Sequence, residues 1–451
     1  MNNKLTRGRG KKILFAAVPS DGHFNPLIRL ARHMQELGYD VRWYAASKYE
    51  KKLRQLQIPL FRFRKSIDTT ISEAELEFPE RKKIKGALNK LKFDLKEFFI
   101  KRGPVYYEDI REIHRTFPFD LLVADIAFTG SIFVKALMKI PIISISVFPL
   151  IETSRDLAPS GLGMEPATGI LGKLKQSFLR FAVKNILLRG PNKLAHRFME
   201  ERGVDHHNTF LFDMIIRNSD YVLQSGSPRF EYKRSDLSRQ IHFIGPLLDN
   251  HPSNFREPWF DNRLLNYEII VLVTQGTVEK DVNKIIVPTL EALRNTGVLI
   301  VCTTGGWQTE ELRNRYNEPN IIIEDFINFN DVMPYADVYV TNGGYGGVML
   351  AIDHNLPMVV AGIHEGKNEI CTRIGYFNYG INLKTETPIP RQIQNAVFET
   401  IRNPLYKQNV EELNREFATY NPNELFEKYV AGLIHRNEIP EIKPRLLAER
   451  A

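Results

Sequence analysis

Short apolar, β-branched runs alternate with helix-like segments along nearly the whole chain. In the first half the candidate strands are KKILFAAV (11–18), DVRWYAA (40–46), PLFRF (59–63), DLLVAD (120–125), PIISISV (141–147), DYVLQS (220–225) and IHFIG (241–245). In the second half they are YEIIVLVTQ (267–275), GVLIVCT (297–303), NIIIED (320–325), DVYVT (337–341), PMVVA (357–361) and YGINL (379–383). Apolar strands separated by helices are typical of parallel sheets covered on both faces. The sequence therefore predicts an α/β protein with doubly wound, Rossmann-like sheets.

A polar, proline-containing stretch, IGPLLDNHPSNFREPWFDNR, separates the two series of strands. It has little periodicity, as is usual for a linker. We therefore place one domain at 12–245, a second at 262–420, and a C-terminal helical segment with a tail at 421–451. Two doubly wound domains that face each other offer one obvious ligand site, the cleft at the carboxyl ends of their strands.

The cysteine content and the lengths of the apolar runs indicate in which compartment the protein is expected. The two cysteines, Cys302 and Cys371, lie in apolar surroundings, and we expect buried thiols in a reducing compartment. The apolar runs fall short of the ~18 residues that a membrane-spanning helix needs. The basic N-terminus also lacks the pattern of a signal peptide. A cytoplasmic protein is the expectation.

The formal net charge is +8, and the excess gathers in two segments, 81–102 and 173–202. It is not spread over an aromatic-rich basic surface, so we do not expect a nucleic-acid partner. The second segment also carries apolar residues at helical spacing, namely Leu174, Phe178, Phe181 and Ile186. Such helices can lie on an anionic membrane. More commonly, they pack on the protein and leave a charged face outward.

Two candidate catalytic residues follow strands of the first domain. His23 comes after the first strand, in PSDGHFNP, and Asp125 ends the strand DLLVAD. In a parallel sheet both positions open toward the same edge, where a carboxylate can hold the proton of one ring nitrogen. The other nitrogen is then able to accept a proton from a substrate. A structural role for a lone loop histidine stays open. We expect the next helix to begin with Asn25 as N-cap and Pro26 as first residue.

A glycine-rich run, NGGYGG (342–347), joins a strand to a helix in the second domain. Backbone amides at a helix N-terminus bind phosphate well where side chains are missing. We predict that a diphosphate reaches the amides of residues 343–347, although a tight turn that serves packing alone remains the alternative. Gly276 and Thr277 follow the first strand of the same domain.

These motifs together resemble those of the UDP-glycosyltransferase superfamily, the GT-B group that includes bacterial macrolide-type and plant natural-product enzymes. GHFNP resembles its N-terminal histidine motif, and VADIAF resembles the segment with its histidine-orienting aspartate. FINFNDVMPYADVYVTNGGYGG resembles its donor signature, and HFIGPL before the linker also fits. The four pieces occur in the family's order. The resemblance implies two facing Rossmann-like domains in the GT-B fold.

The resemblance also implies an activity. It predicts an inverting transfer of a hexose from a nucleotide-diphosphate sugar, UDP-sugar favoured, to a hydroxyl of an apolar small-molecule or lipid acceptor. His23 would be the general base and Asp125 its partner. The family needs no metal or cofactor, and the helix near 422–436 would return to the first domain. The predicted donor-binding residues are Gly276, Thr277, Phe326, Asn342, Gly343, Gly344, Gly346, Gly347, Glu365 and Lys367. Phe24, Phe128 and Phe148 could line the acceptor pocket, although aromatics at such positions are more often core.

The sequence departs from the family pattern on the donor side. Many relatives carry histidine where this chain has Asn342, and their ribose-gripping glutamate falls at Leu350. Their sugar-contacting pair falls near Gly366 and Lys367, with Glu365 as a substitute. A thymidine diphosphate sugar donor, a sugar-nucleotide epimerase and a non-catalytic nucleotide-binding protein therefore stay open. A nicotinamide-dependent dehydrogenase is disfavoured because PSDGHFNP lacks Gly-x-Gly-x-x-Gly.

Overall fold

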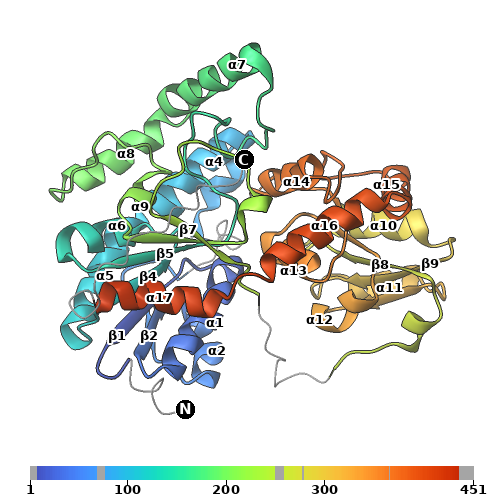
Figure 1. Cartoon of the computed structure of the whole chain (residues 1–451), viewed down its shortest axis with the longest axis horizontal. Coiled ribbons are helices and arrows are strands. Elements are labelled where there is room, and N and C mark those ends of the chain that lie inside the picture. The colour runs from blue at the N-terminus through green and yellow to red at the C-terminus, as the bar shows by residue number, and fades with distance from the viewer. Residues whose placement is uncertain (1–7, 69–76, 249–257, 277–278, 365, 436–451) are drawn as a thin grey trace.

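The computed structural model describes residues 8–68, 77–248, 258–276, 279–364 and 366–435, which form two α/β domains (Figure 1). The first sheet has the order β3-β2-β1-β4-β5-β6-β7, and its neighbouring strands pair in parallel. Its strands are β1 (Lys12–Ala16), β2 (Asp40–Ala45), β3 (Leu60–Arg62), β4 (Leu121–Asp125), β5 (Ile142–Ser146), β6 (Tyr221–Ser225) and β7 (Ile241–Gly245). From the central pair β1 and β4, the strand order runs outward in opposite directions, to β3 at one edge and to β7 at the other, as in a doubly wound fold.

The second sheet is also parallel and has the order β10-β9-β8-β11-β12-β13. Its strands are β8 (Ile269–Thr274), β9 (Val298–Thr303), β10 (Ile321–Glu324), β11 (Val338–Thr341), β12 (Met358–Val360) and β13 (Gly380–Asn382). Separate apolar clusters pack on the two sides of this sheet, because alternate side chains of each apolar strand point to opposite faces. The predicted α/β fold with two doubly wound domains is confirmed, and both cysteines are buried and free.

Helices connect the strands in both domains. Those of the N-terminal domain are α1 (Asp21–Glu36), α2 (Glu50–Gln55), α4 (Ala87–Asp94), α5 (Arg102–Thr116), α6 (Gly130–Phe133), α7 (Gly169–Ala182), α8 (Arg189–Glu200) and α9 (Met214–Arg217). The C-terminal domain has α10 (Ile286–Leu293), α11 (Thr309–Arg315), α12 (Phe329–Val332), α13 (Tyr345–Asp353), α14 (Lys367–Tyr376), α15 (Pro390–Arg402) and α16 (Pro404–Phe417). A π-helical segment, Leu95–Ile100, lies directly before α5.

The predicted start of α1 is wrong. The helix begins at Asp21, after Ser20, and Pro26 lies inside it. The amides of His23 and Phe24 already turn back to the carbonyl of Ser20, at 3.1 and 2.9 Å. Pro26 has no N–H, so the helix omits one hydrogen bond at that position. His23 is therefore held by the first turn of the helix rather than by a loop.

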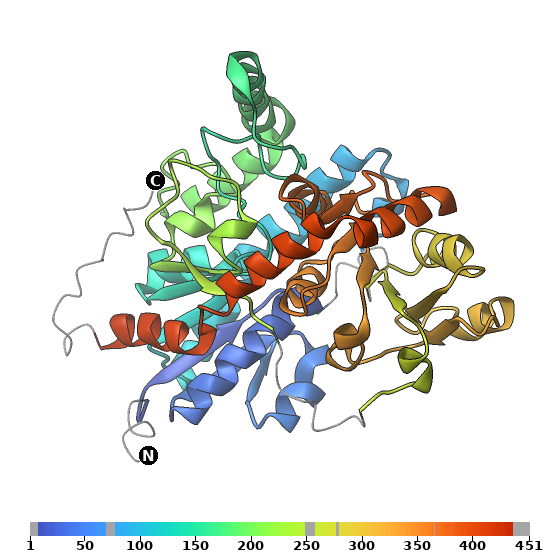
Figure 2. The ribbon, with the colours of Figure 1, turned by 45° about the vertical axis from the view of Figure 1, so that its right-hand side comes forward.

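The last helix, α17 (Pro422–Ile434), crosses back to the N-terminal domain and packs on α1 (Figure 2). Arg29 Nε donates to Asn423 Oδ1 at 3.1 Å, and the His33 and Glu427 side chains lie 3.4 Å apart. Phe426 is fully buried in the core of the N-terminal domain. Helix α17 thus ties the two domains together.

A buried ion pair joins the domains at a second place. Arg373 of α14 donates to Glu231 Oε2 through Nε and Nη2, at 3.1 and 2.8 Å, and also to Glu369. The Arg373 and Glu231 side chains are only 2% and 5% exposed. Glu231 also accepts a hydrogen bond from the Leu150 amide at 2.9 Å. A buried pair needs such additional bonds to offset its desolvation.

Helix α7 projects from the N-terminal domain (Figure 1). Gln176 is its one buried residue, whereas Ile170, Leu171 and Leu174 are 78%, 84% and 61% exposed. The common arrangement expected for this basic segment, an apolar face packed inward, is therefore wrong for α7. Gln176 Nε2 and Arg180 Nη1 donate to the carbonyls of Glu165 and Leu157, at 2.9 and 2.6 Å. These bonds hold the polar side of the helix inward.

Candidate active site

His23 and Asp125 meet at the carboxyl edge of the first sheet. The His23 Nδ1 and Asp125 Oδ1 atoms are 3.0 Å apart. The His23 side chain is 21% exposed, whereas Asp125 is completely buried. This contact joins residues that are 102 positions apart in the chain, and the parallel pairing of β1 with β4 brings them together.

Asp125 is held by the backbone as well as by the histidine. Its Oδ2 accepts from the Val18 amide at 2.7 Å, and its Oδ1 accepts from the Ala127 amide at 2.8 Å. A carboxylate that already accepts two N–H groups acts as an acceptor toward the ring, so Nδ1 of His23 donates. Nε2 then carries the lone pair. The arrangement fixes the tautomer and the orientation that a general base requires.

The three phenylalanines predicted for the acceptor side occupy different environments. Phe148 lies beside the histidine, with ring centroids 5.7 Å apart in an edge-on arrangement. Phe24 is fully buried and stacks on Tyr49 at 3.7 Å, and Phe128 is fully buried against Tyr106 at 4.5 Å. Phe24 and Phe128 are core residues in this structure, and Phe148 alone of the three contacts His23.

The glycine-rich run ends β11 and begins α13. Gly343 has a φ of +81°, and a Cβ there would lie 2.5 Å from Cys371 Sγ. A Cβ at Gly347 would lie 2.8 Å from the Tyr339 hydroxyl. Packing therefore explains these two glycines. A Cβ at Gly346 would meet no atom within 4 Å, and at Gly344 it would lie 3.8 Å from Asn342 Oδ1.

The first amides of α13 have no side-chain cap, because the N-cap residue is Gly344. Open space at Gly346 and uncapped amides at the start of a nine-residue helix form the arrangement that favours an anionic group. Packing therefore explains Gly343 and Gly347, whereas Gly344 and Gly346 leave space beside the uncapped amides. Phosphate binding at these amides stays a prediction.

The other predicted donor residues surround this turn. Asn342 is 8% exposed, and its Nδ2 donates to the Gln275 carbonyl. Gly276 follows Gln275 and has a φ of +75°. Lys367 begins α14, and its carbonyl oxygen is 3.7 Å from the Cβ position of Gly343. Thr277 and Glu365 lie outside the described residues.

Phe326 follows β10 and is 51% exposed. Its ring lies 3.6 Å from the Cβ position of Gly306. Trp307 is 38% exposed, and the ammonium of Lys280 lies 4.2 Å from its ring. Exposed aromatic rings at the carboxyl ends of β9 and β10 suit stacking with a planar base. Leu350, at the position of the family's ribose-binding glutamate, is a partly buried residue packed on the core of α13.

The carboxyl edges of the two sheets meet directly. The hydroxyl of Tyr345, the residue between the glycine pairs, donates to the carbonyl of Ser225 at the end of β6, at 2.6 Å. The loop that follows β5 is also bound to α14. Glu369 Oε1 accepts from the amides of Gly161 and Gly163, each at 2.8 Å. Sequence reasoning missed these contacts, because their partners lie more than a hundred residues apart.

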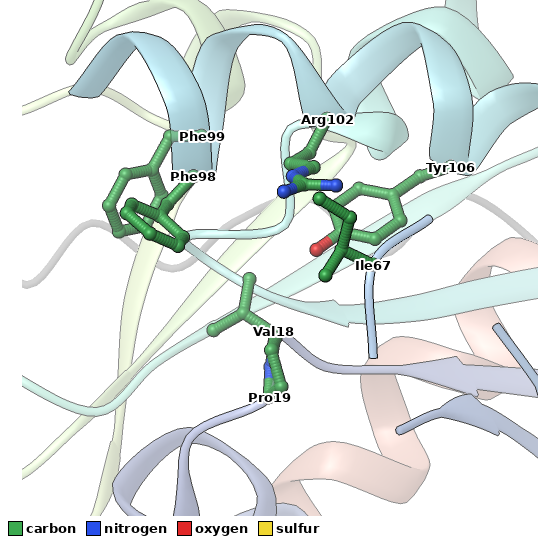
Figure 3. A pocket seen from close by; sticks show the side chains of 7 residues that line it. All are labelled: Val18, Pro19, Ile67, Phe98, Phe99, Arg102 and Tyr106. Atoms are coloured by element: carbon green, nitrogen blue, oxygen red, sulfur yellow. The ribbon is translucent and has the colours of Figure 1, made fainter. Parts of the chain in front are cut away.

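Two cavities accompany these contacts. One of about 420 Å³ lies between the loop after β5 and the C-terminal domain, with Gly163, Glu165, Ile363 and Asn368 among its lining residues. The other adjoins the loop that carries His23 and is far smaller, about 10 Å³, which is room for about one water molecule (Figure 3). It is lined by Val18, Pro19, Ile67, Phe98, Phe99, Arg102 and Tyr106. The positions of Phe98, Phe99 and Tyr106 in the sequence did not indicate that their side chains line a common cavity.

Comparison with known proteins identifies relatives of this chain among glycosyltransferases. A family model described as UDP-glucoronosyl and UDP-glucosyl transferase matches residues 275–420. The chain is 31% identical over 409 residues to 4'-demethylrebeccamycin synthase of Lentzea aerocolonigenes, covering 91% of this chain and 96% of the relative. It is 30% identical over 433 residues to UDP-glucosyltransferase 1 of Beauveria bassiana, covering 90% and 91%.

A solved structure shows the same architecture. The calicheamicin glycosyltransferase CalG4 superposes with a TM-score of 0.74 at 16% identity, covering 96% of this chain and all of that one. At this identity the likeness concerns the fold, whereas the relatives above establish the family. The chain therefore belongs to the UDP-glycosyltransferase superfamily and is a glycosyltransferase with the GT-B fold.

Proposed function

We propose that this glycosyltransferase transfers a hexose from a UDP-sugar to a hydroxyl group of an apolar small-molecule or lipid acceptor, with inversion at the anomeric carbon. The observation that carries the proposal is the contact of His23 Nδ1 with Asp125 Oδ1 at 3.0 Å, with Asp125 held by two backbone amides. His23 Nε2 would take the proton of the acceptor hydroxyl as its oxygen attacks. General-base assistance of this kind contributes about 10²–10⁴-fold to a rate.

The donor half of the proposal rests on the C-terminal domain. The diphosphate would lie at the uncapped amides of α13, and the base would stack on Phe326. Negative charge that develops on the leaving diphosphate would then be met by backbone N–H groups, so the proposed step requires no metal. Attack from the N-terminal domain, opposite the departing diphosphate, gives inversion.

The names of the relatives support a UDP-sugar, since one is a UDP-glucosyltransferase. A thymidine diphosphate sugar is the second candidate donor. It is favoured by one observation, that Leu350 offers no carboxylate to the ribose hydroxyls at the position where the family has glutamate.

Nucleotide binding and turnover test the proposal separately. We expect UDP to raise the melting temperature, because a ligand that binds only the folded state stabilises it. A panel of UDP, dTDP, GDP, ADP and NAD selects the base. His23→Ala should abolish transfer and leave UDP binding nearly unchanged. Unchanged turnover in His23→Ala would exclude His23 as the base, and a product that retains the anomeric configuration would exclude inversion.

We also propose that α7 contacts an anionic membrane surface, from which a lipid acceptor could be drawn. Its outward residues Ile170, Leu171, Leu174, Phe178 and Phe181, followed by Ile186, are 58–84% exposed. Helical spacing places them on one stripe, with Lys173 on one side and Lys175 on the other. An outward apolar stripe between lysines is the pattern of a helix that lies in a membrane interface. None of the described helices is long and apolar enough to cross a bilayer.

Vesicle binding tests the contact. Burying one Leu or Phe side chain contributes about 1.5–3 kcal/mol, so the double variant Leu171→Ser/Phe178→Ser should release the protein from phosphatidylcholine–phosphatidylglycerol vesicles. Leu405→Ser, which changes an exposed leucine of α16, is the matched control. Equal binding of both variants would contradict the proposal. So would dimerisation through α7 without vesicle binding, because the stripe would then be covered by a second copy.

A further inference from the structure

The loop between β5 and α7 is long. Residues 147–168, all of them described, contain neither helix nor strand. Loops of more than about 12–15 residues without structure of their own are uncommon in compact domains, and they commonly serve as lids or binding loops. This loop begins beside the proposed general base, because the Phe148 ring lies edge-on to His23. It is therefore a candidate wall of the acceptor site.

The far part of this loop is bound to α14 of the other domain. Glu369 Oε1 accepts from the amides of Gly161 and Gly163, each at 2.8 Å. The carbonyls of the same two glycines accept from Asn368 Nδ2 at 2.8 Å and from Thr372 Oγ1 at 3.0 Å, respectively. Both backbone polar groups of each glycine are thus bonded to one helix, which fixes the place of the loop.

The close approach of the loop to α14 depends on glycine. Gly161 and Gly163 have φ values of +96° and +59°, in the region that other residues rarely adopt. A Cβ at Gly163 would lie 2.9 Å from Asn368 Cβ. A side chain at Gly163 would therefore push the loop away from the helix.

One buried arginine links this contact to the part of the loop near His23. Arg373 Nη1 donates to Glu369 Oε2 at 2.9 Å, so the Glu369 carboxylate bridges the arginine and the loop. Arg373 also binds one oxygen of Glu231, whose other oxygen accepts from the Leu150 amide at 2.9 Å. All three charged side chains are largely buried, so salt and water screen these bonds little. Two carboxylates that share one arginine thus hold the loop at two places.

We propose that Glu369 is a positioning residue for the reaction, which fixes the loop after β5 from the C-terminal domain as one wall of the acceptor site. Glu369 would act through the loop and not on the reacting atoms. Helix α14 begins with Lys367, a predicted donor-binding residue, so one helix would serve both substrates. The inference rests on the proposed transfer to an acceptor bound in the N-terminal domain.

Removal of the Glu369 carboxylate tests this role through the acceptor KM. Loss of a hydrogen bond to a charged group costs about ten- to hundredfold in an equilibrium. Because the acceptor would bind only the docked loop, we expect Glu369→Ala to raise the acceptor KM by about tenfold or more. At saturating acceptor kcat should stay near wild type, as should the affinity for UDP. Glu369→Gln keeps an oxygen for the two glycine amides and should restore part of the acceptor affinity.

The assay uses UDP-glucose as donor and the acceptor that reacts fastest in a panel of apolar phenols and long-chain alcohols. Glu310→Ala is the matched control, because Glu310 also lies in the first turn of a C-terminal-domain helix and pairs with an arginine of that helix, Arg313, at 2.6 Å. It should leave the acceptor KM unchanged. Gly163→Ala disturbs the same contact from the loop side. Combined with Glu369→Ala, it should raise the acceptor KM little further.

Hydrogen exchange shows whether the loop is released, independently of transfer. Amides in peptides that cover 157–165 should exchange faster in Glu369→Ala than in wild type or Glu310→Ala. The acceptor Kd, measured from melting curves without donor, should rise by the same factor as the acceptor KM.

Three outcomes would overturn the inference and leave the proposed function standing. One is faster exchange with an unchanged acceptor KM and Kd, because the loop would then not bind the acceptor. Another is unchanged exchange, because Glu369 would then not hold the loop. The third is an equal loss of UDP affinity, because the variant would then have disturbed α14 as a whole. Absence of transfer by the wild type to every acceptor would contradict the proposed function instead, and the Kd values of the panel would then decide the inference.

Discussion

Replacing Asp125 by asparagine tests the catalytic geometry more sharply than any other single change. The carboxylate makes three hydrogen bonds as an acceptor: from Val18 N at 2.7 Å, from Ala127 N at 2.8 Å and from His23 Nδ1 at 3.0 Å. An asparagine amide has only one acceptor oxygen. If its NH₂ takes the place of Oδ2, it meets the Val18 N–H, donor against donor. If it takes the place of Oδ1, it meets the Ala127 N–H and favours the wrong tautomer of His23.

The first orientation is less costly, because the NH₂ group then faces one donor, the Val18 N–H. In the second orientation it faces both the Ala127 N–H and the His23 Nδ1–H. The first orientation leaves a buried N–H unsatisfied, which costs about 1–3 kcal/mol of folding stability. It also removes the negative charge that stabilises the protonated imidazole, and we expect transfer to fall by about 10²–10⁴-fold. In free energy of activation this is about 2.7–5.4 kcal/mol, at 1.36 kcal/mol for each tenfold change.

The assay is UDP release from the UDP-sugar in the presence of an acceptor, with thermal unfolding and UDP affinity measured in parallel. Asp120→Asn is the matched control, because Asp120 precedes the same strand and its carboxylate accepts the Lys12 amide at an exposed position, at 2.8 Å. In the background of His23→Ala, Asp125→Asn should cost little further activity, since Asp125 acts through the histidine. Asp125→Asn activity within about threefold of wild type would refute the general-base reasoning.

Three further predictions concern other parts of the site and the interface. Gly343→Ala should destabilise the protein by about 1–3 kcal/mol in chemical denaturation, because φ is +81° and the new Cβ would meet Cys371 Sγ at 2.5 Å; an unchanged midpoint would contradict the packing described. Arg373→Met should cost about 3–5 kcal/mol by leaving Glu231 buried without its partner, and adding Glu231→Gln should restore part of the loss in a double-mutant cycle. Phe326→Ala should weaken UDP binding by calorimetry, by about 1–3 kcal/mol if the base stacks as aromatic–base contacts do elsewhere, and unchanged affinity would place the base elsewhere.

Local patterns in the sequence were sufficient to predict the fold. The apolar runs identified both sheets because a strand that is covered on both faces must be apolar throughout, and this property is visible in five or six consecutive residues. The positions of His23 and Asp125 at strand ends predicted that they could meet, since parallel strands share one carboxyl edge. The glycine run indicated where the backbone must be approached closely.

Other features depended on how distant segments pack. The sequence pattern gave α7 an apolar stripe but not the direction in which it points, and only docking through Gln176 and Arg180 turns it outward. The sequence suggested both Phe24 and Phe148 as acceptor-pocket residues, yet Phe24 is buried in the core and Phe148 contacts His23.

The contact between the two domains also depends on how distant segments pack. Glu231 and Arg373 are 142 residues apart, and neither carries a local sign of its partner. Periodicity and strand-end residues act over a few positions, so a single chain reveals them. Burial, pairing and the direction of a helical face are set by contacts between segments far apart in the chain, and only the tertiary structure decides them.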